Sequence, residues 1–230
     1  MERQENLRSN NVLKEEYSKS KIFVSIIILF HIVGLVGLSI PATRSLFLYI
    51  VPFHLLLMLA VVVLNHNYVD SRFLFFVLIV FVLGFIAEWT GVHKHWLFGD
   101  YHYGKTLGFQ LFDVPLIIGL NWFLLTYSTG VLMDRSRLKS MFFRIITGAL
   151  LLVLLDVLIE SMAMRLDYWH WANDVIPVKN YICWFFASAF MLLIFELFRF
   201  KKQSIVAPVL LLTEFVFFGL LCLLAVCHLS

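Results

Sequence analysis

Two carboxyl groups lie four residues apart near the end of an apolar stretch. On a helix, Asp156 and Glu160 would share one face, about one turn from each other. Two acids this close in a poor dielectric cannot both ionise easily, so we expect one to stay protonated near neutral pH. A neutral acid beside a carboxylate is suited to general acid–base catalysis. The alternative is a structural pair that is hydrogen-bonded to Asn121 or Asn180.

Two further acids lie at the same end of their predicted helices. Glu88 closes one apolar stretch, and Asp113 opens the next. A carboxyl group in hydrocarbon is costly enough to count as a functional-site hypothesis by default. We therefore predict that these four acids gather in a buried site near one face of a membrane.

Apolar stretches must position these acids. The chain has 230 residues, of which 61% are hydrophobic and 14% charged, and its mean hydropathy is +0.90, far from the composition of soluble domains. A transmembrane helix needs about 20 mostly apolar residues. We predict an all-α fold, a polytopic membrane helix bundle of about seven transmembrane helices. The expected spans are Ile22–Ile40, Leu46–Leu64, Phe73–Trp89, Leu111–Met133, Met141–Glu160, Tyr181–Phe198 and Ile205–Cys227.

The distribution of Lys and Arg predicts how the bundle is oriented. The N-terminal segment and the second, fourth and sixth loops together hold twelve Lys and Arg residues, whereas the first, third and fifth loops together hold five. We expect residues 1–21 to be a polar cytoplasmic segment and residues 22–230 a single transmembrane domain. The C-terminus would lie outside, and the membrane would be a bacterial inner membrane. We expect no nucleic acid partner.

Two loops on the predicted outer side exceed the roughly 2 to 8 residues that usually connect helices in a bundle. They are Thr90–Gln110 and Ser161–Asn180. Long loops of this kind are often lids or binding elements. Glycines and apolar residues in the first loop favour a re-entrant segment that lines a cavity. The aromatic candidates for substrate binding are Tyr101, Tyr103, Trp169 and Trp171, for which simple placement at the membrane interface is the alternative.

Histidines raise the question of a metal. His93, His95 and His102 lie in the loop after Glu88, and imidazole with carboxylate suits zinc or iron. Membrane di-iron oxygenases, however, use repeated histidine boxes, and the sequence has none. We therefore expect no metal and no other cofactor. Glu214, near the middle of the last span, is a polar residue without an evident role.

Two blocks of motifs resemble a known family. The first begins Glu88-Trp-Thr-Gly91 and continues through Phe98-Gly99-Asp100-Tyr101-His102-Tyr103, Leu107-Gly108 and Val114-Pro115 to Trp122. The second contains Asp156, Glu160, Met162-Ala-Met, Asp167-Tyr-Trp169-His-Trp171, Ile176-Pro177, Asn180-Tyr181 and Trp184. Together they resemble the membrane-embedded carotenoid biosynthesis family that includes the CruF-type carotenoid hydratases and the bisanhydrobacterioruberin hydratases. Ser161 departs from the proline expected after Glu160 in this branch.

The resemblance implies addition of water to the terminal C1,C2 double bond of an acyclic ψ-end carotenoid, without a redox cofactor. Such a hydratase needs a proton donor, a proton acceptor and walls that tolerate a tertiary cation. We expect Asp156 and Glu160 to form the acid–base pair, Glu88 and Asp113 to complete the polar site, and Asn180 to orient water. Asn121 and the four loop aromatics would bind substrate. The expected partners are a carotenoid, the lipid bilayer and other enzymes of the carotenoid pathway.

Two other functions compete with hydration. Cyclisation or isomerisation of the ψ-end would begin with the same protonation but would add no water. A non-catalytic transporter or lipid-binding protein would also have several spans with intramembrane acids. The acids gather at one face and do not form a relay across the bilayer, which disfavours transport.

Overall fold

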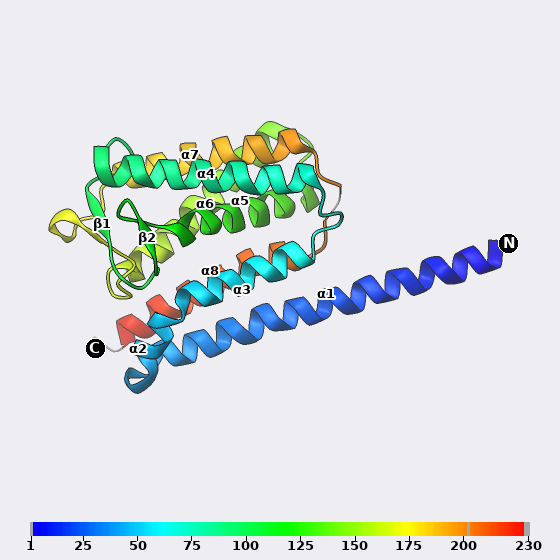
Figure 1. Cartoon of the computed structure of the whole chain (residues 1–230), viewed down its shortest axis with the longest axis horizontal. Helices are drawn as coiled ribbons and strands as arrows, with labels where there is room; N and C mark the ends of the chain where they lie inside the picture. The colour runs from blue at the N-terminus through cyan, green and yellow to red at the C-terminus, as the bar shows by residue number, and fades with distance from the viewer. Residues whose placement is uncertain (1, 202, 228–230) are drawn as a thin grey trace.

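The computed structural model describes the backbone of residues 2–201 and 203–227, and the side chains of residues 18–201 and 203–226. The expected cytoplasmic residues Arg3, Arg8 and Lys14 lie outside the described side chains. The helices are α1 (Glu2–Ser39), α2 (Pro41–Tyr49), α3 (Val51–Leu64), α4 (Ser71–Lys94), α5 (Leu116–Arg135), α6 (Met141–Ala163), α7 (Val178–Phe198) and α8 (Val206–Cys227) (Figure 1).

The described residues form an all-α polytopic bundle, as predicted. Six helices are long and apolar enough to cross a membrane, and the pair α2 and α3 makes a seventh apolar segment. The predicted span Leu46–Leu64 is not one straight helix, because α2 and α3 meet at an angle of 58°. Pro52 lies in the first turn of α3, where its missing N–H is tolerated. In the interior of one continuous helix from α2 to α3, the same proline would remove a backbone hydrogen bond and clash with the preceding turn.

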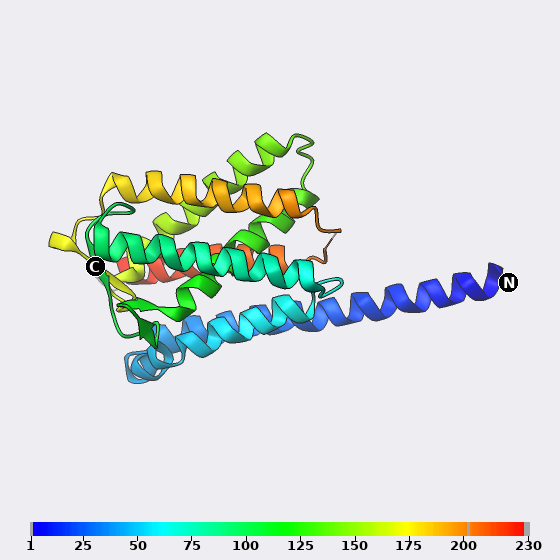
Figure 2. The same cartoon turned by 45° about the horizontal axis from the view of Figure 1, so that its top comes forward.

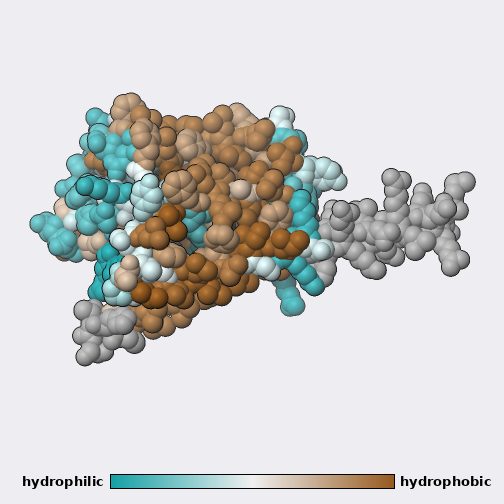
Figure 3. Space-filling view, turned by 60° about the horizontal axis from the view of Figure 1, so that its bottom comes forward, coloured by the Kyte–Doolittle hydropathy of each residue, from teal (hydrophilic) through white to brown (hydrophobic). Residues whose placement is uncertain are grey.

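Apolar side chains cover the sides of the bundle. Phe53, Phe75 and Phe186 are each more than half exposed, and Figure 3 shows a broad hydrophobic band between hydrophilic ends. A soluble protein rarely exposes so large an apolar surface. The chain is therefore an integral membrane protein. The N-terminal part of α1 extends beyond the other helices (Figures 1 and 2).

Helix α5 forms the core of the bundle. It packs against α3, α4, α6, α7 and α8, and nearly all of its residues from Trp122 to Val131 are buried. Gly84 on α4 allows a close approach, because a Cβ there would lie 2.6 Å from Trp122 Cβ. Trp122 is thereby brought beside the helix face that carries Glu88, one turn after Gly84.

The two long loops fold into short strands. After α4, the chain forms β1 (Tyr101–Tyr103), β2 (Gln110–Leu111) and β3 (Val114–Pro115), and after α6 it forms β4 (Trp169–Trp171) and the 3₁₀ turn η1 (Ala172–Asp174). Strands β2 and β3 make a hairpin. Strand β1 pairs antiparallel with β4, so the two loops join across one end of the bundle (Figure 1).

Candidate active site

The β1–β4 ribbon presents four aromatic side chains on one face. Its register places Tyr101 opposite Trp171 and Tyr103 opposite Trp169. Successive side chains of a strand point to opposite faces, so the central residues His102 and His170 face away. The ring centroids of Tyr101 and Trp171 are 5.1 Å apart, and those of Tyr103 and Trp169 are 6.3 Å apart. The sequence Tyr-His-Tyr therefore faces Trp-His-Trp as a matched pair.

Glu88 accepts three hydrogen bonds in a buried position. Tyr101 Oη and Tyr103 Oη donate to its Oε2 atom at 2.6 and 2.7 Å. Trp122 Nε1 donates to Oε1 at 2.9 Å. Gly91 lies three residues after Glu88 on α4 and has no side chain to obstruct Tyr101. A Cβ there would lie 2.5 Å from the phenol oxygen of Tyr101.

Glu160 is held by an equivalent set of donors from the other strand. Trp171 Nε1 and Trp169 Nε1 donate to Glu160 Oε2 at 2.7 and 3.1 Å. Asn180 Nδ2, from the first turn of α7, donates to Oε1 at 3.2 Å. Each strand of the ribbon thus supplies two donors to one carboxyl group.

Asp156 lies beside this site without reaching the cavity. It is fully buried, and Asn180 Nδ2 donates to its Oδ2 atom at 2.8 Å. Its Oδ1 atom is buried with no hydrogen-bond partner among the described residues. The amide of Asn180 therefore bridges the two acids of α6. Of the two amides considered for a structural pair, Asn121 and Asn180, it is Asn180 that contacts both acids.

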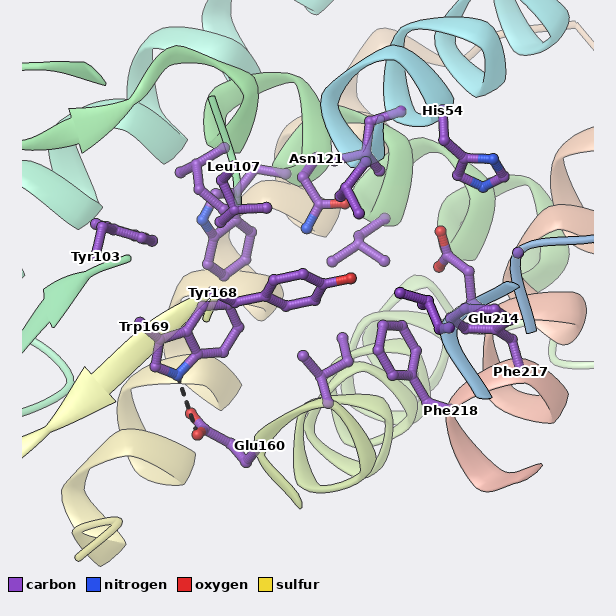
Figure 4. Close-up of a pocket in the computed structure, with 18 of the residues that line it drawn as sticks. His54, Tyr103, Leu107, Asn121, Glu160, Tyr168, Trp169, Glu214, Phe217 and Phe218 are labelled. Carbon is purple, nitrogen blue, oxygen red and sulfur yellow. Dashed lines mark hydrogen bonds between the residues drawn. The ribbon is translucent and has the colours of Figure 1, made fainter. Parts of the chain in front are cut away.

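A single cavity of about 450 Å³ connects these groups. Glu88, Glu160 and Asn180 line the end of the cavity that lies next to the β1–β4 ribbon. Trp122 and Trp184 stack in its wall with ring centroids 4.4 Å apart. Most of the remaining wall is apolar. Figure 4 shows Tyr103, Trp169 and Glu160 at one end, and Asn121, Tyr168, His54 and Glu214 directed into the cavity further along.

The two tyrosines act as neutral donors. Burial is the main cause that raises the pKa of Tyr101 and of Tyr103 well above the usual value, and the carboxyl group of Glu88 raises both further. Both phenols therefore keep their protons at physiological pH.

The structure places Asp113 apart from the other three acids. It lies in the turn between β2 and β3 with a positive φ of 60°, and its side chain is 80% exposed. Its carboxylate is 3.4 Å from His93 Nε2. Helix α5 begins at Leu116 and not at Leu111, so Asp113 precedes the helix that it was expected to open.

The three loop histidines also lie apart from the cavity. His95 lies 3.5 Å from Asp100, and the ring of His102 stacks on His170 at 5.4 Å. Within residues 18–201 and 203–226, no group of three or more His, Cys, Asp or Glu side chains is arranged to hold a metal ion.

Several residues that line the cavity were not predicted from the sequence. Trp122 belongs to the quoted motifs but was given no role, and Trp184, Tyr168 and His54 were assigned none. Trp122 directly follows Asn121 in the sequence, which was a signal that this turn of α5 faces a polar site. The unexplained position of Glu214 in an apolar helix was a second signal.

The fold and this geometry define a polytopic membrane protein with three buried carboxyl groups in one cavity, two of them, Glu88 and Glu160, held by aromatic donors. The family model described as carotenoid biosynthesis protein matches residues 48–229. The chain belongs to this family. No curated protein and no solved structure matches the chain.

Proposed function

We propose that the protein is a carotenoid hydratase, a hydro-lyase that acts in the direction of hydration. It adds water to the terminal C1,C2 double bond of an acyclic ψ-end. The observation that supports this proposal best is that two carboxyl groups, each held by three donors, face one largely apolar cavity with aromatic walls.

The first step is transfer of a proton from a carboxylic acid to C2 of the alkene. The π electrons form the new C–H bond, and a tertiary cation remains at C1. The faces of Trp169, Trp171, Tyr101 and Tyr103 stabilise this cation without forming a bond to it. A water oxygen then forms the C–O bond, and the second carboxyl group takes the excess proton.

We assign Glu160 as the acid and Glu88 as the base. The contacts to Glu88, at 2.6, 2.7 and 2.9 Å, are shorter as a set than those to Glu160, at 2.7, 3.1 and 3.2 Å. Donors to a carboxylate favour its charged form. Glu88 is therefore the more readily ionised of the two, and we assign it as the carboxylate that is free to accept a proton.

Asp156 is a positioning residue in this proposal, in place of the direct partner of Glu160 that the sequence suggested. It holds Asn180, and Asn180 in turn contacts Glu160 and lines the cavity. Asn180 also orients water beside the substrate. Asp113 has no direct role, because its exposed carboxylate faces His93.

The substrate reaches the cavity from the bilayer. Phe30 and Val33 of α1 and Phe53 of α3 line the cavity, and each is more than 40% exposed on the apolar side of the bundle. A carotenoid is a long polyene that resides in lipid. One end would enter here while the rest remains in the membrane or contacts other enzymes of the pathway.

The test is expression in a lycopene-producing bacterium, followed by chromatography of the pigments with mass detection. Hydration gives products heavier by one or two water molecules. A new pigment of unchanged mass would refute hydration and support the cyclase or isomerase function, which uses the same protonation. Unchanged pigment with purified lycopene and with other acyclic carotenoids would favour a binding or transport protein.

We further propose that the protein resides in a bacterial inner membrane with its N-terminus in the cytoplasm. The excess of Lys and Arg in the N-terminal segment and in the even-numbered loops supports this orientation. Glu88, Glu160 and the β1–β4 ribbon would then lie near the outer face of the membrane.

A further inference from the structure

The inner part of the cavity contains polar side chains without protein partners. They come from four segments and comprise Glu214 on α8, His54 on α3, Asn121 on α5 and Tyr168 in the loop before β4, and we call them the polar compartment. Glu214 is 8% exposed and Tyr168 is 7% exposed. Among the described residues, none of these four side chains forms a hydrogen bond through its own polar atoms.

The geometry shows that these groups are directed at a common space. In Figure 4 the phenol of Tyr168 extends along the cavity toward the carboxyl group of Glu214, and His54 and Asn121 flank the same region. Phe217 and Phe218 complete an apolar wall beside Glu214. His31 closes this end, with its ring centroid 4.7 Å from that of His54 and its Nδ1 atom 2.8 Å from Ile27 O.

Among the residues that the structure describes, no Lys or Arg lines the cavity. Buried polar groups in proteins are nearly always hydrogen-bonded, which applies to Glu214 and Tyr168, whereas His54 and Asn121 are partly buried beside them. The hydrocarbon end of a carotenoid offers no hydrogen bond. The ligand must therefore be small and must both donate and accept, because carboxyl, imidazole, phenol and amide groups surround it.

We propose that the polar compartment holds the water that the hydration consumes. This inference rests on the proposed function and adds the site of its second substrate. A buried water needs two to four polar partners, and the compartment offers four side chains in a cavity that also contains Glu160 and Glu88. Without a retained water, the apolar walls would leave the cation at C1 with no nucleophile.

The compartment decides the fate of the cation. With water at hand, its oxygen lone pair forms the C–O bond to C1, and the excess proton of the resulting oxonium passes through the cavity to Glu88. Without it, the cation loses a proton from a neighbouring carbon to the carboxylate, which gives an alkene of unchanged mass. Removal of the compartment's polar groups should therefore divert product from alcohol to alkene while protonation continues.

The experiment uses full-length protein in liposomes with lycopene in D₂O, and mass detection of both products. Protonation places deuterium at C2, so deuterium in the unhydrated carotenoid reports protonation independently of hydration. For Glu214→Leu, and separately for Tyr168→Phe, we expect the ratio of alcohol to deuterated alkene to fall by about tenfold, the effect of one buried hydrogen bond. Thr213→Val is the matched control on α8, because Thr213 Oγ1 donates to Val209 O of its own helix and to no other group in the described part of the chain.

With lycopene as substrate and folded protein, the inference would be overturned by an unchanged ratio in both variants, or by parallel loss of alcohol and deuterated alkene. Folding is checked for each variant by size-exclusion chromatography. An acyclic carotenoid with a hydroxyl group is tested in parallel. A fall of the ratio with that substrate alone would also overturn the inference, because the compartment would then bind the substrate's oxygen. Wild-type protein that yields neither alcohol nor deuterium exchange would instead refute the proposed function itself.

Discussion

Glu88 and Glu160 owe their environments to side chains that lie far apart in the sequence. Glu88 binds two tyrosines of β1 and Trp122 of α5, and Glu160 binds two tryptophans of β4 and Asn180 of α7. A helical spacing of four was sufficient to predict that Asp156 and Glu160 share a face. It did not reveal that Asp156 lies behind Asn180, because the depth of a side chain depends on the neighbouring helix.

Replacement of either cavity carboxyl group should abolish hydration. We expect Glu160→Gln and Glu88→Gln to lower the rate of alcohol formation by about 100-fold or more, since each removes a proton-transfer group but keeps the shape. Asp113→Asn is the control, and its rate should stay near wild type because Asp113 is exposed outside the cavity. Chromatography of products from purified protein measures all three. Normal hydration by both Gln variants would refute the assignment.

The effects of substitutions at Asn180 and at Asp156 on the stability of the fold should not be independent. Asn180→Leu leaves Asp156 buried without any hydrogen bond, so we expect a loss of about 1 to 3 kcal/mol in the free energy of unfolding. The double variant Asn180→Leu with Asp156→Leu should recover part of this loss, because no unpaired acid remains. Thermal unfolding in detergent tests both. If the double variant loses at least as much free energy of unfolding as the two single variants lose together, this coupling is contradicted.

At the scale of elements, the helices were largely predictable and the ribbon was not. Long apolar runs mark membrane spans reliably, because every backbone group in lipid must be satisfied within a helix. The pairing of β1 with β4 joins segments about seventy residues apart, and nothing local in Tyr101–Tyr103 specifies that partner. The break at Ile50 was missed because Pro52 lies inside an uninterrupted apolar run.

Gly104 should be essential for the ribbon. A Cβ at this position would lie 2.2 Å from the backbone oxygen of Asp167, which cannot move without disturbing β4. We expect Gly104→Ala to reduce both hydration and thermal stability. Gly219→Ala on α8 is the matched control, because no atom of the described residues lies within 4 Å of its added Cβ. Equal hydration rates and equal melting temperatures of the two variants would show that the ribbon tolerates displacement.

His66 should make the stability of the helix packing depend on pH. It follows α3, stacks on Phe73 of α4 at 3.7 Å and lies 2.6 Å from Tyr127 Oη of α5. Burial lowers the pKa of His66 to about 4, and Asp70 only partly opposes this shift. An unfolded histidine titrates near pH 6.5, so between these values the unfolded state binds more protons.

The stability that His66 contributes is therefore complete above pH 6.5 and is lost as pH falls toward 4. We expect the melting temperature of the wild type to fall over this range more steeply than that of His66→Phe, which keeps the ring stacking but cannot titrate. Melting curves in detergent at several pH values provide the comparison. Parallel slopes for the two proteins would exclude His66 as the cause.

For the whole molecule, composition indicated a membrane protein and the bundle bears this out. The exposed apolar sides and the buried helix α5 follow directly from the bilayer as solvent. The position of the cavity could not be predicted, since it depends on how α1, α3 and α8 pack against the other helices. Asn121, Tyr168 and Glu214 become neighbours only through this packing.

Orientation in the membrane can be tested by cysteine labelling in intact cells. In a chain whose native cysteines are replaced, we expect Asp113→Cys to react with an impermeant maleimide and Arg137→Cys to react only after lysis. Both positions are exposed, one beside the ribbon and the other in the loop between α5 and α6. The reverse labelling pattern would place the N-terminus outside.

The β1–β4 ribbon also governs when the protein can first become active during its synthesis. Glu88 and its tyrosines are made early, but the strand opposite them is complete only when Trp171 has been added, and Asn180 comes later still. A nascent chain that ends before Trp171 has no closed site. The site that we propose therefore closes late in synthesis, after α6 and β4 have been made and most of the bundle has been inserted.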